Sequence, residues 1–451
     1  MVLVTQFEGQ ELENYFVTDT IVENLEEATE SYSRVKIKEW NQIVKNSDTA
    51  RKLGEEKKAS IVIWGKYGKT KEVVPISVNF EVMESIKSYP KLEAEARGKF
   101  QRMAIDDLEN FNLQTHLSEE MAYLTLFTLG MINYEAEEWD IAISYFTDSM
   151  RQIDQYSSFL DREVLYFYRG NSYADKGEYN LAIADYNQAI KFNPNYASAY
   201  NSRGIIYSKQ GKYELAIADY NQAIKLNPNY ASAYNNRGLT YAYKKEYNLA
   251  IVDINQAIQV NSNNANYYYN RGNIYSDKRK YNLAITDYNQ AIKLNPNDAE
   301  AYYNRGIIYS KQGKYKLAIA DYNQAIKLNP NYAGAYNNRG ITYAYKEEYD
   351  LAITDYNKAI KLNPNLAQAY VNRGIIYSKQ GEYELAITHY NKAIKLNPNL
   401  AQAYYNRGNA YKNKGDKDKA INHFKKVLEL TNYPELRKKA EYQLKELEKY
   451  Q

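Results

Sequence analysis

A basic residue recurs at a fixed interval along this 451-residue chain, and an acidic residue follows it at a fixed distance. Eight arginines stand 34 residues apart, at Arg169, Arg203, Arg237, Arg271, Arg305, Arg339, Arg373 and Arg407. Sixteen residues after each of the first six stands an aspartate, at Asp185, Asp219, Asp253, Asp287, Asp321 and Asp355. Because the guanidinium fork matches a carboxylate, this spacing predicts an ion pair inside each interval. The alternative is a basic ladder that faces an acidic partner.

The other candidates for chemistry do not form a catalytic or metal site. Residues 65–70 read Gly-Lys-Tyr-Gly-Lys-Thr and end like a phosphate-binding loop, but Ile63 stands where that motif needs glycine. A strand follows instead of a helix, so we expect a β-hairpin turn there. The three histidines, His116, His389 and His423, lack metal-ligand spacing, and no nucleophile, base and orienting group occur together. The sequence predicts a protein that is not an enzyme, without a catalytic residue, metal site or cofactor.

Composition excludes further classes of protein. With 44% hydrophobic and 25% charged residues, the chain is globular and neither disordered nor fibrous. The absence of cysteine excludes a disulfide scaffold and a thiolate metal site. A net charge of +3 argues against a nucleic-acid partner, because no large cationic excess is present to neutralise phosphates. Short apolar stretches and the absence of a signal-peptide pattern predict no membrane partner and a cytoplasmic location.

The elements that position these residues are copies of one unit. The chain has 50 tyrosines but only 11 phenylalanines, a bias that indicates a short repeat. With the glycine that follows each arginine numbered as position 8, eight units cover residues 163–434. Tyrosine recurs at positions 4, 11, 17 and 24, and alanine at positions 20 and 27. Positions 4, 8, 11 and 20, 24, 27 each follow the i, i+4, i+7 rule. Each unit is therefore predicted to be two antiparallel helices, A and B, ended by an Asn-Pro-Asn turn.

These units resemble tetratricopeptide repeats, whose pattern has small and aromatic residues at the same positions. A degenerate unit at residues 118–162 fits the same frame through Gly130, Trp139, Ala142 and Phe146. The resemblance implies a mainly α fold, a right-handed α-solenoid (superhelix) of about nine helix-turn-helix units over residues 118–434. An amphipathic helix at residues 435–451 is expected to cap it, with Leu436, Ala440, Leu444 and Leu447 on one side.

The amino-terminal residues 1–90 follow a different period and predict a small mixed α/β domain. The expected order is strand, long helix, strand, helix, strand, hairpin and strand. Residues 50–54, leading into residues 59–65, resemble the small α/β domain of TolB-amino-terminal and related bacterial envelope-lipoprotein families. Residues 91–117 are expected to form a connecting helix. A strand that starts at residue 2 suggests a piece of, or descent from, a longer protein.

The resemblance implies a concave groove lined by helix A, with positions 2, 5, 6, 9, 12 and 13 facing it. Position 6 is asparagine in six consecutive units, namely Asn236, Asn270, Asn304, Asn338, Asn372 and Asn406. A side-chain amide both donates and accepts, so such a row can hold the main chain of an extended peptide. The alternative is that these amides only bond neighbouring backbone groups.

Further candidate groove residues come from positions 5 and 13. They are Tyr269, Tyr303 and Tyr405 at position 5, and Lys209, Tyr243, Lys311, Tyr345 and Lys379 at position 13. Repeats that clasp the carboxyl terminus of heat-shock chaperones carry lysine at positions 2 and 5, and no lysine stands at either position here. Chaperone-tail binding is therefore not predicted.

The sequence thus predicts an interaction scaffold that binds an extended peptide or protein segment in the concave groove. The alternative is a sensor whose α/β domain binds a small ligand and whose repeats relay that event to a partner. Both hypotheses require a protein or peptide partner and leave the oligomeric state open.

Overall fold

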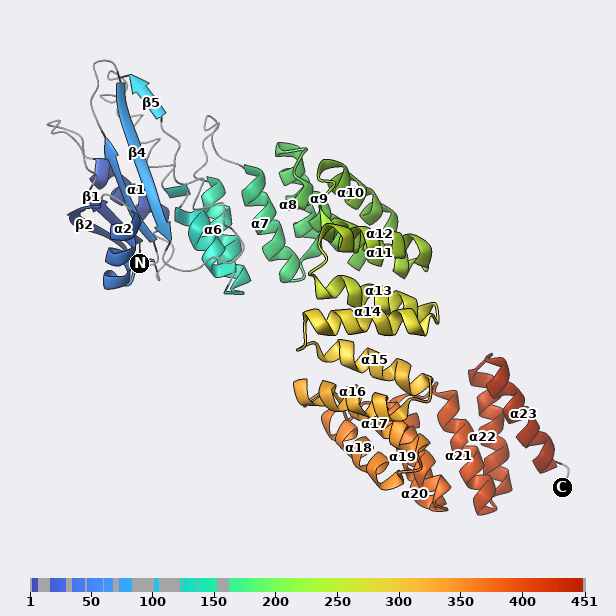
Figure 1. The fold of residues 1–451 in the computed structure, drawn as a ribbon. Helices are drawn as coiled ribbons and strands as arrows, with labels where there is room; N and C mark the ends of the chain where they lie inside the picture. Colours follow the sequence, from blue (N-terminus) through green and yellow to red (C-terminus); the bar gives the residue numbers. More distant parts are fainter. Residues whose placement is uncertain are drawn as a thin grey trace. The chain divides into compact units, whose positions relative to one another are not determined.

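A five-stranded sheet opens the chain in the computed structural model (Figure 1), with strand order β2-β1-β3-β4-β5. The structure describes residues 2–6, 17–29, 35–44, 47–59, 61–67, 73–82, 101–104, 122–123, 125–134, 136–151 and 162–448. The chain forms two units, residues 1–240 and 241–451.

Three parallel strands and two antiparallel ones make up the sheet. Strand β1 (Val2–Gln6) pairs in parallel with β2 (Ile37–Ile43) and β3 (Ile61–Tyr67). Strand β4 (Val73–Val82) runs antiparallel to β3, and β5 (Gln101–Ala104) runs antiparallel to β4. Helices α1 (Val17–Thr29) and α2 (Ser47–Lys57) make the crossovers that parallel neighbours require.

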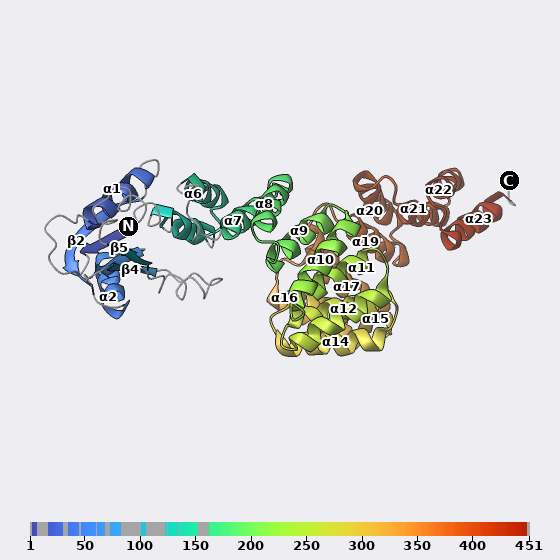
Figure 2. The same cartoon turned by 90° about the horizontal axis from the view of Figure 1, so that it is seen from above.

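The two helices lie on opposite faces of the sheet (Figure 2). Because neighbouring side chains of a strand point to opposite faces, Ile63 is buried with Leu25 of α1, whereas Val62 is buried with Leu53 of α2. The predicted α/β domain is confirmed in its order of strands and helices.

Two local expectations concern the connections of this domain. Because β3 and β4 pair antiparallel in the register Tyr67 to Ile76, they are the strands of the expected hairpin, while residues 68–72 lie outside the described residues. The expected connecting helix at 91–117 is wrong at Gln101–Ala104, which form β5. The edge of β4 offers unpaired backbone groups, and a strand satisfies them where a helix would not. The rest of 91–117 lies outside the described residues.

The first helix pair packs on the sheet domain. It consists of a helical segment at residues 125–134 and helix α6 (Trp139–Arg151), in the expected degenerate unit. A Cβ at Gly130 would lie 2.5 Å from the Phe146 ring, so only glycine fits. Leu126 of this pair shares a buried cluster with Val4 of β1. The α/β domain and the first repeat therefore have a common core.

Eight regular helix pairs follow, and the predicted α-solenoid of repeats is confirmed. The A helices are α7 (Arg162–Asp175), α9 (Ala197–Lys209), α11 (Ala231–Tyr243), α13 (Ala265–Asp277), α15 (Ala299–Lys311), α17 (Ala333–Tyr345), α19 (Ala367–Lys379) and α21 (Ala401–Lys414). The B helices are α8 (Tyr179–Phe192), α10 (Tyr213–Leu226), α12 (Tyr247–Val260), α14 (Tyr281–Leu294), α16 (Tyr315–Leu328), α18 (Tyr349–Leu362), α20 (Tyr383–Leu396) and α22 (Lys417–Leu430).

Close packing of a glycine against a tyrosine holds A and B together within a repeat. A Cβ at Gly306 would lie 2.9 Å from the ring of Tyr322, whose side chain is fully buried. The turn between repeats is closed by its first asparagine, whose side chain accepts the backbone N–H two residues on, as Asn227 does from Asn229 at 3.0 Å. The residues that recur every 34 positions thus form both the contact between helices A and B and the turn between repeats.

Helix α23 (Pro434–Glu448) covers the last repeat. Ala440 and Leu444 lie in a buried cluster with Phe424 and Val427 of α22. The expected capping helix is confirmed, and it gives the final apolar face a partner. Among the residues that the structure describes, no helix is long and apolar enough to cross a membrane.

Candidate functional site

The arginine row at position 7 is built into the repeat framework. In repeats 1, 2, 4, 5 and 6 the arginine donates through Nε and Nη2 to both oxygens of the position-23 aspartate, at 2.6–2.9 Å. From the second repeat on, Nη1 also donates to an asparagine of the preceding repeat, as Arg305 does to Asn289 at 2.7 Å. The guanidinium lies over the position-4 tyrosine ring in all eight repeats. These contacts favour the ion-pair interpretation over a ladder for an acidic partner.

Burial and pairing act against each other at these arginines. Burial disfavours the Arg169 cation, but its bonds to Asp185 prevail and raise the pKa of the guanidinium. Burial also raises the pKa of the Asp185 carboxyl, in spite of the lowering effect of Arg169. The pair joins helix A to helix B and leaves little charge to present to solvent.

The last two repeats carry histidine where the others have aspartate. Arg373 Nη2 donates to His389 Nδ1 at 3.1 Å, and Arg407 Nη2 donates to His423 Nδ1 at 3.3 Å. Burial, followed by the neighbouring arginine, lowers the pKa of both histidines to about 4, so both are neutral at pH 7. A neutral ring accepts one bond where a carboxylate accepts two. The Nε atoms of both arginines are accordingly buried without a partner in residues 162–448.

Four asparagines of the row at position 6 join their repeat to the one before it. In the first unit, Asn236 Nδ2 donates to Asn201 Oδ1 at 3.0 Å. In the second unit the same atom donates to a position-5 side chain in three repeats, from Asn304 to Tyr269 at 2.9 Å, from Asn338 to Tyr303 at 3.0 Å and from Asn372 to Asn337 at 2.9 Å. These four bonds therefore run to neighbouring side chains, and not to the backbone groups of the alternative hypothesis. Positions 5 and 6 together are called the helix A row below.

The helix A row keeps some capacity for further bonds. Tyr269 and Tyr303 accept from asparagine, so each hydroxyl still has its own hydrogen to donate. Burial raises the pKa of both hydroxyls, which keeps them protonated. Asn372 is only 8% exposed, and Asn406 Oδ1 accepts from Gln402 at 3.0 Å. Asn270 is half-buried and has a partner, and Tyr405 packs on Phe424.

Four of the five candidate residues at position 13 lie beside helix B of the preceding repeat. The ammonium groups of Lys209, Lys311 and Lys379 lie over the rings of Tyr179, Tyr281 and Tyr349, at 5.5–5.9 Å. Tyr345 stacks on Tyr315 with ring centroids 5.7 Å apart. Tyr243 and Tyr345 are 65% and 63% exposed. We call positions 13–19 of each repeat, where helix A turns into helix B, the A–B edge.

A row of leucines on the A–B edge was not among the sequence candidates. Position 19 is leucine in seven repeats, with side chains 38–51% exposed, at Leu181, Leu215, Leu249, Leu283, Leu317, Leu351 and Leu385. The signal was available, since position 19 falls outside the buried face of positions 20, 24 and 27.

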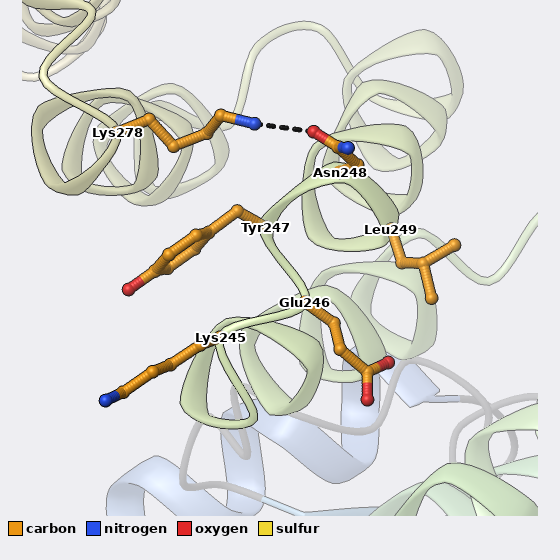
Figure 3. Close-up of a pocket in the computed structure, with 6 residues that line it drawn as sticks. All are labelled: Lys245, Glu246, Tyr247, Asn248, Leu249 and Lys278. Carbon is orange, nitrogen blue, oxygen red and sulfur yellow. Dashed lines mark hydrogen bonds between the residues drawn. The ribbon is translucent and has the colours of Figure 1, made fainter.

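The A–B edge of the third repeat carries an open notch of about 530 Å³ (Figure 3). It is lined by Lys245, Glu246, Tyr247, Asn248 and Leu249, and by Lys278 of the fourth repeat. Lys278 donates to Asn248, and Figure 3 shows the side chains of Lys245 and Tyr247 extending in the same direction. Position 13 of the fourth repeat is Asp277, and no ring or cation of residues 162–448 stacks on Tyr247.

The side chains of the rows and of the A–B edge form no metal centre within the part of the chain that the structure describes. Among the described residues, no three His, Asp or Glu side chains come together as metal ligands would.

Family models match most of the repeat region. A model described as TPR repeat matches residues 170–211, 272–313, 340–381 and 376–415. Two models described as tetratricopeptide repeat match residues 197–230, 231–264, 299–332 and 401–430, and residues 321–354. No curated protein matches the chain.

Several solved structures are similar to parts of the chain. The chain is 29% identical to YrrB, described as a TPR protein with an unusual peptide-binding site, over 41% of this chain and 95% of that one, with a TM-score of 0.35. It is 33% identical to MamA over 37% and 90%, with a TM-score of 0.33. It is 20% identical to a tetratricopeptide repeat protein from Parabacteroides merdae ATCC 43184 over 55% and 98%, with a TM-score of 0.47. By its family-model matches over more than half of its length, the chain belongs to the tetratricopeptide repeat family.

Proposed function

We propose that this chain is a non-enzymatic scaffold whose helix A face holds an extended segment of a partner protein. The observation that carries the proposal is the helix A row in the second unit. There three asparagine amides, of Asn304, Asn338 and Asn372, are fixed by a side chain of the preceding repeat. A row oriented in this way loses little side-chain entropy when it binds.

An extended segment suits this row because its main chain offers one donor and one acceptor per residue. The protonated hydroxyls of Tyr269 and Tyr303 can donate to its carbonyls. Such contacts bind the main chain of the segment and do not depend on its side chains. Selectivity between partners must then come from residues outside the row.

The test uses two pairs of adjacent tyrosines. Tyr269→Phe with Tyr303→Phe removes the two hydroxyls of the row and keeps ring volume. The matched control is Tyr268→Phe with Tyr302→Phe, since these position-4 rings lie under Arg271 and Arg305 in the framework. We expect the first variant to lose most of the proteins that co-purify with the full chain, and the control to keep them. Equal recovery by both variants would reject the proposed row.

A second candidate is the sensor, and one observation favours it. Val4 and Ile63 of the sheet, Leu25 of α1 and Leu126 of the first repeat share one buried cluster. A ligand that shifts the α/β domain would therefore change the packing of the first repeat directly. The full chain, which keeps this cluster intact, should show a rise in Tm with a nucleotide or metabolite of a screening panel. A flat response across the panel would remove the sensor hypothesis.

The finer assignments stay predictions. The domain boundaries are 1–90, 91–117, 118–434 and 435–451, apart from the strand at Gln101–Ala104. The cytoplasmic location, the bacterial source and the absence of nucleic-acid and membrane partners belong with them. The likeness of residues 50–65 to the TolB-amino-terminal domain also stays a prediction.

A further inference from the structure

The A–B edge changes charge along the second unit. In repeats 3, 4 and 5 positions 13–19 hold eight basic and two acidic residues. In repeats 6 and 7 the same positions hold two basic and five acidic residues. Outside these positions repeats 3 to 5 each carry no net charge, and repeats 6 and 7 carry +2 and +3, so the change to acidic residues is confined to the edge.

The basic part of the edge is not neutralised from within. In repeats 6 to 8, edge lysines pair with carboxylates, Lys346 with Glu348, Lys414 with Glu384 and Lys419 with Asp416. In repeats 3 to 5 the one edge lysine that pairs with a carboxylate of residues 162–448 is Lys244, with Glu246 at 3.0 Å. On the edge of repeats 3 to 5, the exposed cations that neither pair with a carboxylate of residues 162–448 nor lie over a ring are Lys245, Arg279, Lys280, Lys314 and Lys316. We call these five residues the cationic edge.

Apolar surface accompanies the cationic edge at every repeat. Leu249, Leu283 and Leu317 are 49%, 45% and 50% exposed. The notch beside Leu249 adds the ring of Tyr247, since Asp277 does not cover it as lysine or tyrosine covers the equivalent rings in other repeats. Cations and apolar side chains therefore recur together over three repeats.

We infer that the cationic edge docks an acidic segment of the partner protein, whose carboxylates face the cations and whose apolar side chains cover the leucines and Tyr247. This inference rests on the proposed scaffold function and supplies the selectivity that the helix A row lacks. Clustered cations without internal partners attract an acidic segment and speed its association. Half-exposed leucines favour a peptide over a nucleic acid. Phosphates gain nothing from contact with leucine, and bases stack on aromatic rings and not on aliphatic side chains.

The experiment measures binding of a defined probe to the full chain. The probe is a fluorescein-labelled peptide of six Glu-Glu-Leu triplets, followed by fluorescence polarisation in 50 mM NaCl. A Lys-Lys-Leu peptide and an oligothymidylate of equal length are the comparison ligands. The edge variant is Lys280→Glu with Lys314→Glu and Lys316→Glu. The matched control, Lys293→Glu with Lys327→Glu and Lys361→Glu, makes the same charge change at exposed lysines near the other end of helix B.

We expect the acidic peptide to bind the wild type and the control, and to lose about tenfold or more in affinity on the edge variant. No binding to the wild type, or equal losses in the two variants, would overturn the inference. Tighter binding of the oligothymidylate than of the acidic peptide would overturn the assignment of a protein partner. If the edge variant keeps its co-purifying proteins while the Tyr269→Phe, Tyr303→Phe variant loses them, the edge inference fails and the proposed scaffold stands.

Discussion

The helix A row and the cationic edge belong to the same part of the array, but the fold has used their polar groups to different extents. On the row, the amide nitrogens of Asn304 and Asn338 already donate to the preceding repeat. On the edge, Lys280 and Lys314 are exposed and pair with no carboxylate of residues 162–448.

This difference separates residues that build the array from residues available to a partner. Positions 6, 7, 8, 23 and 24 hold nearly the same residue types in each repeat, and their atoms contact one another. Positions 13–16 and 18 vary between repeats and reach solvent wholly or in part. Substitutions in the first group should change stability, and substitutions in the second group should change binding.

The largest effect is expected at a buried ion pair. Asp321→Ala leaves the Arg305 cation without the two bonds that compensate its burial. The free energy of unfolding should fall by about 3 kcal/mol, measured by urea denaturation. Asp350→Ala, at an exposed position of α18, is the control and should change it by about 0.5 kcal/mol or less. Equal losses would show that the pair is not part of the framework.

The histidines of the last two repeats should make the stability of the fold depend on pH. Their pKa is about 4 in the fold and 6.5 as the ordinary value, so the unfolded chain takes up protons first. Stability should therefore fall as the pH drops from about 6.5 to about 4, by at most about 1 kcal/mol for each half-exposed ring.

Replacing both histidines with aspartate should remove this pH dependence of stability. In His389→Asp with His423→Asp, each carboxylate can accept from both Nε and Nη2, as Asp355 does from Arg339. The gain at pH 7 should be roughly 1 kcal/mol per site. A variant whose stability drops over pH 6.5 to 4 as steeply as the wild type would contradict this account of the acid response.

A smaller effect is expected on the helix A row. Asn338→Ala removes the bond to the Tyr303 hydroxyl and should lower the free energy of unfolding by about 1 kcal/mol. Asn266→Ala, at an exposed position of α13, is the comparison and should be nearly neutral. If the two variants unfold together, the row does not connect repeats.

The sequence predicted what depends on spacing along one chain segment. The interval between Arg305 and Asp321 was enough to predict their pair, and Gly306 and Tyr322 were enough to predict the A–B contact. The interpretation of residues 65–70 as part of a hairpin agrees with the pairing of β3 and β4, for the same local reason.

The features that the sequence did not predict depend on neighbours far along the chain. Strand β5 forms because the edge of β4 is open to it, which the pattern of residues 101–104 does not reveal. The bond from Asn304 to Tyr269 spans two repeats and depends on how they pack. The contact of Lys311 with the Tyr281 ring also depends on how two repeats pack. Lys311, a residue predicted to face the groove, lies on the A–B edge through this contact.

Site-specific photo-crosslinking of the full chain tests the central claim most directly. p-Benzoylphenylalanine is placed, one position at a time, at Asn266 on helix A, at Lys280 on the cationic edge and at Gln259 near the end of helix B, all exposed. The account predicts the same discrete protein adduct from positions 266 and 280 and none from position 259. Equal adduct yields from all three positions, or an adduct from position 259 alone, would contradict it.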